Sequence, residues 1–185
     1  MADEIEIVEY DRNWPRMFDE ERVLLEMVLP ADQILAIEHA GSTAIPDLAA
    51  KPIIDIFVAV RSVEVLRATL IDPIEATGYV YWAENPDRSR MFFVKGMPPY
   101  GTRRTHHVHV LEPTSDAWQR VLVFRDYLRE HHDEAQRYLR LKRRLAQQYP
   151  SDREAYTRAK DSYIIDVVEL ARKPVPRHGL KLNKL

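Results

Sequence analysis

Strand-like segments, alternating or rich in β-branched residues, occur in this chain only within residues 1–112, whereas after Ser115 apolar residues recur only at helical spacing. Five strands are expected, over residues 33–39, 52–60, 79–82, 91–94 and 106–111. Helices are expected at residues 13–29 and 62–77, the second with a break at Pro73, and three more helices follow the last strand. This segregation predicts an α+β domain, with a mixed or antiparallel sheet of about five strands covered by helices and a C-terminal helical section.

The length of the chain fits a single domain. Its 185 residues bury a sufficient core without disulfides, and the absence of cysteine excludes thiolate metal sites and thiol nucleophiles. We expect one domain over residues 1–172, with a sheet part at 1–112 and a helical part at 113–172. Residues 173–185 carry four Lys or Arg and no acid, which indicates a flexible basic tail.

The charge balance limits the classes of partner. Lys and Arg number 27 against 29 Asp and Glu, so general nucleic-acid binding is not expected. The amino terminus is acidic and does not resemble a secretory signal. The most apolar run, residues 52–60, is interrupted by Asp55 and is too short to cross a bilayer. The sequence therefore predicts a cytoplasmic protein with no membrane partner.

One polar loop lies between the first two expected strands and carries Gly41, Ser42 and Thr43. Glycine lets a ligand approach the backbone, and a serine hydroxyl with successive N–H groups can hold phosphate oxygens. Lys51 and Asp55 follow, and a carboxylate inside an apolar run is costly to bury unless it is paired or bound to a cation such as Mg²⁺. The alternative interpretation is a tight turn in which a hydroxyl caps a short helix.

A second constellation is the histidine-rich strand at residues 105–109. Because side chains alternate along a strand, His107 and His109 are expected on one face and His106 on the other. Two such imidazoles either share a metal ion or supply an acid or base, while Arg103 holds an anion. The alternative is a structural or solvated pair of histidines.

The C-terminal helices add a third group. Arg153, Tyr156 and Lys160 are spaced to share one helix face that can turn toward the sheet. Other charged residues of this region, such as Arg125 and Asp126, are expected on solvated faces or in ion pairs between helices.

Five segments in this order are specific enough to compare with known families. They are Tyr10 and Asp11 with residues 14–18, the string HAGSTAIPDLAAKPIIDI at 39–56, THHVH at 105–109, FRDYLR at 124–129, and Arg153 with Tyr156 and Lys160. Over residues 8–171 the chain resembles the GrpB family, whose domain belongs to the nucleotidyltransferase-fold superfamily. A similar domain is also fused behind dephospho-coenzyme A kinase in some bacteria. No kinase activity is expected here, because the chain lacks a Gly-rich loop ending in Gly-Lys-Ser or Gly-Lys-Thr.

The resemblance implies that Gly41 and Ser42 stand where nucleotidyltransferases hold nucleotide phosphates. It also implies that Asp55 stands where one of two metal-binding carboxylates lies. Those enzymes usually carry two acids separated by one residue, whereas Ile53 and Phe57 occupy both such positions here. Either the two histidines replace the missing carboxylates, or nucleotidyl transfer has been lost. The chain also departs from the family pattern at position 47, where aspartate replaces the glycine of many relatives.

Three functions are consistent with these residues. The first is metal-dependent nucleotidyl transfer from a nucleoside triphosphate, with Mg²⁺ or another divalent metal as cofactor. Its candidate catalytic and metal-binding residues are Asp55, His107 and His109, and its candidate phosphate-binding residues are Gly41, Ser42, Thr43, Lys51, Arg103 and Lys160. The second is a non-catalytic module that binds a nucleotide or another phosphorylated small molecule and acts through a protein partner. The third is a hydrolase with a His and Asp metal site.

Overall fold

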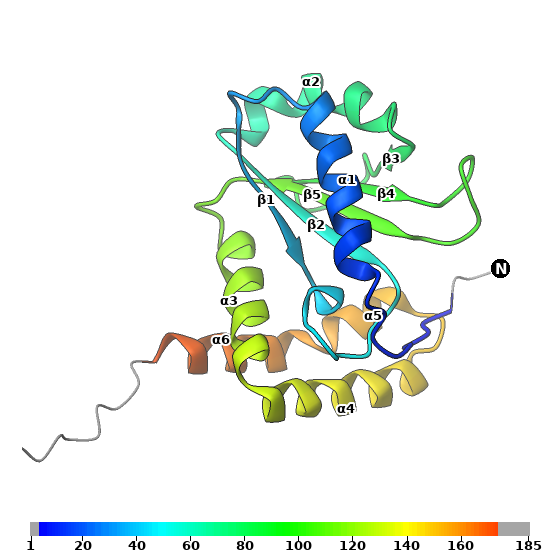
Figure 1. Ribbon diagram of the computed structural model, residues 1–185, viewed down its shortest axis with the longest axis vertical. Helices are drawn as coiled ribbons and strands as arrows, with labels where there is room; N and C mark the ends of the chain where they lie inside the picture. The colour runs from blue at the N-terminus through cyan, green and yellow to red at the C-terminus, as the bar shows by residue number, and fades with distance from the viewer. Residues whose placement is uncertain (1–3, 174–185) are drawn as a thin grey trace, which may run out of the picture.

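A single mixed sheet organises the computed structural model, which describes residues 4–173 (Figure 1). Its strands are β1 (Ile34–Ala40), β2 (Ile54–Val60), β3 (Tyr79–Tyr81), β4 (Met91–Lys95) and β5 (His106–Leu111). Their order across the sheet is β1-β2-β5-β4-β3, and only β2 and β5 pair in parallel. The mixed five-stranded sheet expected from the sequence is confirmed.

Two helices cover one face of this sheet. They are α1 (Trp14–Val28), which crosses the sheet in Figure 1, and α2 (Val63–Glu75). The alternation of β2 directs Ile54, Ile56 and Val58 toward this face, where they are fully buried and pack in one cluster with residues of both helices. This cluster is the main hydrophobic core.

The opposite face is covered only in part. Helix α3 (Asp116–Glu130) places Trp118 in an apolar cluster with Phe57 of β2 and Leu111 of β5. Below the sheet in Figure 1, α3 packs with α4 (His132–Gln148) and α6 (Asp161–Arg172). Ile45 and Leu48, from the loop between β1 and β2, are buried among these helices, so the C-terminal helices hold this loop.

The sequence predicted a break in α2 at Pro73, but the helix is continuous through this residue. The helix continues to Glu75 because Leu70 and Ile74, on either side of the proline, are fully buried in the main core. Their packing outweighs the loss of one helical hydrogen bond.

The sequence predicted three C-terminal helices. In place of the last one, the structure has two separate helices, α5 (Arg153–Arg158) and α6. Lys160 lies at the junction as the N-cap of α6, so it does not share one continuous helix face with Arg153 and Tyr156. Tyr156 of α5 packs in a small cluster with Leu145 of α4, whereas α6 packs in a separate cluster with α3 and the first half of α4. Except for Lys173, the expected basic tail lies outside the described residues. Within residues 4–173, no helix combines the length and the apolar character needed to span a membrane.

Candidate functional site

Three candidate residues meet on the partly covered face of the sheet. The parallel register of β2 and β5 places Asp55 opposite His107, and His109 follows two residues later on the same face. The ligand atoms of the three side chains all lie within 4.8 Å of one another. His107 Nδ1 lies 3.0 Å from Asp55 Oδ1, at hydrogen-bonding distance. The expectation that His107 and His109 share a face is therefore met, and strand pairing adds the carboxylate.

The surroundings set the charges of this cluster. Burial raises the pKa of Asp55, but the hydrogen bond and the charge of His107 outweigh burial, so that the net pKa is lowered. Burial lowers the pKa of His109 to about 3, against the opposing attraction of Asp55. At neutral pH the cluster thus holds one ionised carboxylate and a neutral imidazole at His109, whose Nδ1 lies 3.4 Å from Arg90 Nη1 and can accept a hydrogen bond from it.

The donor set fits a divalent metal ion. One carboxylate with two imidazoles is the ligand set of many zinc and non-haem iron sites, whereas Mg²⁺ prefers oxygen ligands alone. His107 Nε2 is buried and has no hydrogen-bond partner among the described residues, so the ring retains unused donor or acceptor capacity. The residues present therefore suit one ion of the Zn²⁺, Mn²⁺ or Fe²⁺ type better than a pair of magnesium ions.

The backbone after β1 passes directly against the carboxylate. Gly41 has φ +68° and ψ −171°, and a Cβ built there would lie 2.2 Å from Asp55 Oδ2. That conformation is nearly exclusive to glycine, so both the strain and the contact require glycine here. In the same loop Asp47 has φ +59°, a left-handed conformation that glycine adopts more readily than most other residues.

The hydroxyls of the loop have different surroundings. Ser42 is half-buried at the start of a 3₁₀ turn (Ser42–Ala44), near the Tyr138 hydroxyl of α4. Thr43 is buried, and its Oγ1 donates to the Ile53 carbonyl at 3.3 Å. Its hydroxyl also lies 3.1 Å from His39 Nε2, so Thr43 connects the two ends of the loop between β1 and β2.

Three lysines lie beside this loop. Lys51 and Lys160 flank one aromatic ring, with their Nζ atoms 5.2 Å and 4.2 Å from the centroid of Tyr156. Burial and the repulsion from Lys51 lower the pKa of Lys160 to about 7, and Asp55 partly opposes this shift. The third, Lys142 of α4, donates from Nζ to the Ala49 carbonyl at 2.6 Å. We call these three residues the lysine cluster; an anion bound beside them would favour their protonated, positively charged forms.

The sequence did not indicate that Lys142 is buried beside the loop. It stands in a basic run at residues 137–144 that is typical of a solvated helix face. Lys142 is only 2% exposed, and burial with repulsion from Lys160 lowers its pKa to about 7. One signal could have found it, because Lys142 shares the helical spacing of the buried residues Tyr138, Leu139 and Leu145.

Arg103 lies in a different environment. Its side chain is 68% exposed, and its guanidinium donates to Glu6 Oε2 at 2.8 Å. It lines a small surface pocket together with Lys51, Arg104 and Arg153. Lys51 is the residue that this pocket has in common with the lysine cluster.

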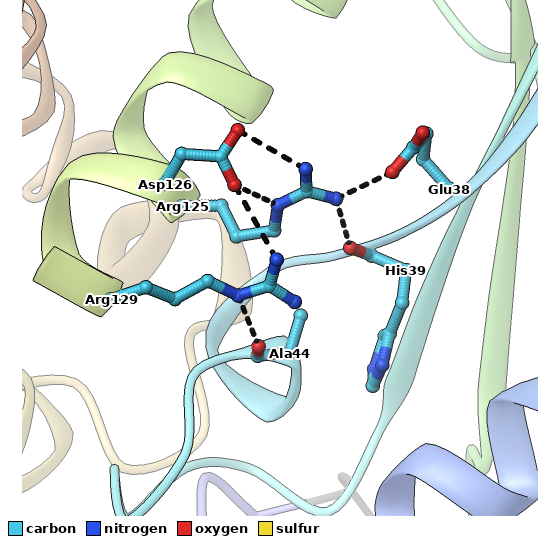
Figure 2. Close-up of polar contacts among 6 residues, drawn as sticks. All are labelled: Glu38, His39, Ala44, Arg125, Asp126 and Arg129. Atoms are coloured by element: carbon cyan, nitrogen blue, oxygen red, sulfur yellow. Dashed lines mark hydrogen bonds and ion pairs between the residues drawn. The ribbon is translucent and has the colours of Figure 1, made fainter.

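Two arginines of α3 fix the segment that leads into the loop (Figure 2). Arg125, which is 8% exposed, donates from Nη1 to Glu38 Oε2 at 2.7 Å and to the His39 carbonyl at 2.8 Å. Arg129 Nε donates to the Ala44 carbonyl at 2.9 Å. Asp126 accepts from Arg125 Nε at 2.7 Å and links the two arginines. The sequence pattern indicated solvated faces or ion pairs between helices. Arg125 is indeed ion-paired, but with Glu38 of β1 and its neighbour Asp126, and its buried guanidinium also holds the His39 backbone carbonyl.

Comparison with known proteins gives consistent matches over nearly the whole chain. The pattern described as GrpB protein matches residues 4–170. A UPF0157 protein of Pseudomonas aeruginosa is 47% identical over 184 residues, covering 96% of this chain and 74% of the relative. The crystal structure of conserved protein GrpB from Enterococcus faecalis has a TM-score of 0.78 and 37% identity, covering 90% of this chain and 96% of that chain.

A further match concerns the fused domain expected from the sequence. A dephospho-CoA kinase of Mycolicibacterium paratuberculosis is 28% identical over 189 residues, covering 90% of this chain but only 46% of the kinase. This chain therefore corresponds to part of that longer protein. Together with the matching pattern and the shared fold, these likenesses show that the chain belongs to the GrpB family.

Proposed function

We propose that this protein is a metal-dependent enzyme that transfers a nucleotidyl group from a nucleoside triphosphate to an acceptor hydroxyl. One observation carries the proposal: the Asp55, His107 and His109 donor atoms lie within 4.8 Å of one another, and Gly41 of the serine-bearing loop touches the same carboxylate. The residues that we propose for metal binding and those that we propose for phosphate binding thus adjoin at one place.

Each group has a defined task in this reaction. Asp55, His107 and His109 would hold one divalent ion, which supplies Lewis-acid polarisation of a phosphoryl oxygen when bound. Ser42 and the Gly41 backbone would contact phosphate oxygens, with the lysine cluster offsetting their charge. The acceptor oxygen bonds to the α-phosphorus, the bond to pyrophosphate breaks, and the hydroxyl proton passes to water. Positioning and electrostatic stabilisation supply most of the rate in such reactions.

A second function, hydrolysis, is favoured by the donor set. Two histidines and one carboxylate are typical of single-metal hydrolytic sites, in which water takes the place of the acceptor hydroxyl. The same residues would serve both reactions. The two reactions differ in whether the α-phosphorus ends up bonded to an acceptor molecule or to water.

The test follows the products. The protein is incubated with Mn²⁺ or Zn²⁺, a nucleoside triphosphate labelled at the α-phosphorus, and a protein-free extract of small molecules as acceptors. Transfer predicts pyrophosphate together with label in a new compound, whereas hydrolysis predicts label only in the nucleotide or its fragments.

Matched variants give the controls. Asp55→Asn is expected to abolish product formation, and Asp116→Asn, an exposed carboxylate in the first turn of α3, is expected to retain it. Metal-dependent binding without either product would instead indicate a non-catalytic module. If neither metal nor triphosphate binds, the proposal is wrong.

A further inference from the structure

An apolar strip continues from the metal-ligand candidates across the same sheet face. The strand register places Phe92 of β4 beside His109, and Val94 beside His107. One strand further, Val80 lies beside Val94, and the Trp82 N–H donates to the Phe92 carbonyl. We call Val80, Trp82, Phe92 and Val94 the aromatic strip.

The rings of the strip contact the metal-ligand candidates directly. The Phe92 ring centroid lies 5.1 Å from that of His107 and 4.7 Å from that of His109. On its other side the Phe92 ring meets the ring of Trp82 edge to face at 5.8 Å. A continuous surface therefore runs from the two imidazoles to the indole.

The strip lacks the cover that the other face has. Phe93 and Met91, which alternate with Phe92 along β4, are fully buried in the main core. In contrast, none of the four strip residues belongs to a buried apolar cluster of the part of the chain described by the structure. Trp82 is 41% exposed. Exposed aromatic surface next to a polar cluster is typical of a ligand site.

We propose that Phe92 and Trp82 form the platform on which the base of the nucleotide stacks. This inference rests on the proposed function, because it places the organic part of the ligand whose phosphates lie near Asp55. Neighbouring strands are about 4.8 Å apart, so the platform lies roughly 5 to 10 Å from His109, a separation that a ribose can bridge. Stacking on aromatic rings tolerates every base, so the strip selects for a flat ring more than for one base.

The experiment compares two ligands with the same triphosphate group, ATP and methyl triphosphate, each titrated with Mn²⁺ into the full chain. Trp14 and Trp118 are buried, so a ligand that stacks on Trp82 should quench the exposed part of the tryptophan emission. ATP is expected to quench this emission and to bind about 10-fold more tightly than methyl triphosphate, in line with measured stacking energies.

Variants separate the strip from the metal and phosphate groups. Trp82→Ala is expected to reduce the affinity for ATP about 10-fold and to leave methyl triphosphate binding unchanged, which also shows that the variant is folded. Tyr100→Ala, which removes an exposed aromatic ring from another loop, is the matched control and is expected to change neither affinity.

Two results would overturn the inference. If both ligands bind equally and Trp82→Ala has no effect, the base does not stack on the strip, although the proposed function survives. If neither ATP nor methyl triphosphate binds with Mn²⁺, the proposed function is wrong and the inference falls with it.

Discussion

Replacing Gly41 by alanine tests the contact between the loop and the carboxylate. The new Cβ would lie 2.2 Å from Asp55 Oδ2, closer than any real van der Waals contact, so the carboxylate must move away from it. Gly78 provides a matched control, since it also has positive φ but its nearest new neighbour would be Lys95 Cε at an ordinary 3.6 Å.

The magnitudes follow from these two environments. An alanine with positive φ costs on the order of 1–3 kcal/mol of unfolding free energy, and both variants bear a cost of this kind. Gly41→Ala bears two further costs: the disturbed hydrogen bond between Asp55 and His107, and the clash itself. A charge-assisted hydrogen bond contributes about 1.5–3 kcal/mol, and the 30% exposure of the Asp55 side chain reduces this to about 1 kcal/mol. We therefore expect Gly41→Ala to lose about 1–3 kcal/mol more than Gly78→Ala.

Urea unfolding of both variants measures this difference, and a double-mutant cycle identifies its cause. In an Asp55→Ala background the clash is absent, so the cost of Gly41→Ala should fall to that of Gly78→Ala. Mn²⁺ affinity, measured by calorimetry, should drop in Gly41→Ala and remain unchanged in Gly78→Ala. Equal costs for the two glycine variants, or strict additivity with Asp55→Ala, would refute the reasoning.

Three further predictions concern stability. The pKa of Lys142 is lowered to about 7 in the folded protein. Between pH 7 and the ordinary lysine pKa, the unfolded state therefore binds more protons than the folded state. The free energy of unfolding should consequently fall as the pH is lowered through that window. Lys142→Met should remove on the order of 1 kcal/mol per pH unit from this dependence, as chemical unfolding at pH 7, 8 and 9 would show. Arg125→Ala should cost about 2–3 kcal/mol of unfolding free energy because the His39 carbonyl loses a buried donor. Arg129→Ala, at a more exposed side chain, should cost about 1 kcal/mol or less. Equal losses of stability in thermal unfolding would contradict the role assigned to Arg125. Ile56→Ala, in the main core, should cost about 2–5 kcal/mol without changing Mn²⁺ affinity.

The sheet could be predicted because its strands carry a local signal. Ile54, Ile56 and Val58 alternate with residues of the other face, and the same alternation correctly grouped His107 with His109. The position of Asp55 beside these histidines depends on parallel pairing of β2 with β5. That pairing joins strands distant in sequence and leaves no local pattern in either.

The errors have a common physical cause. Lys142 and Arg125 resemble solvated charges in the sequence, and their burial arises only when α3 and α4 pack on the loop after β1. Pro73 stays within its helix because core packing outweighs a local propensity. The junction at Lys160 likewise reflects packing of α5 and α6 in two different apolar clusters.

The most direct test of the account is an anomalous diffraction measurement on crystals soaked with Mn²⁺ or Zn²⁺. We predict one strong peak at coordination distance, roughly 2.0–2.2 Å, from an oxygen of Asp55 and a nitrogen of each of His107 and His109, and its disappearance in Asp55→Asn crystals. A peak elsewhere, or none at saturating metal, would contradict the assignment of these three residues as a metal centre.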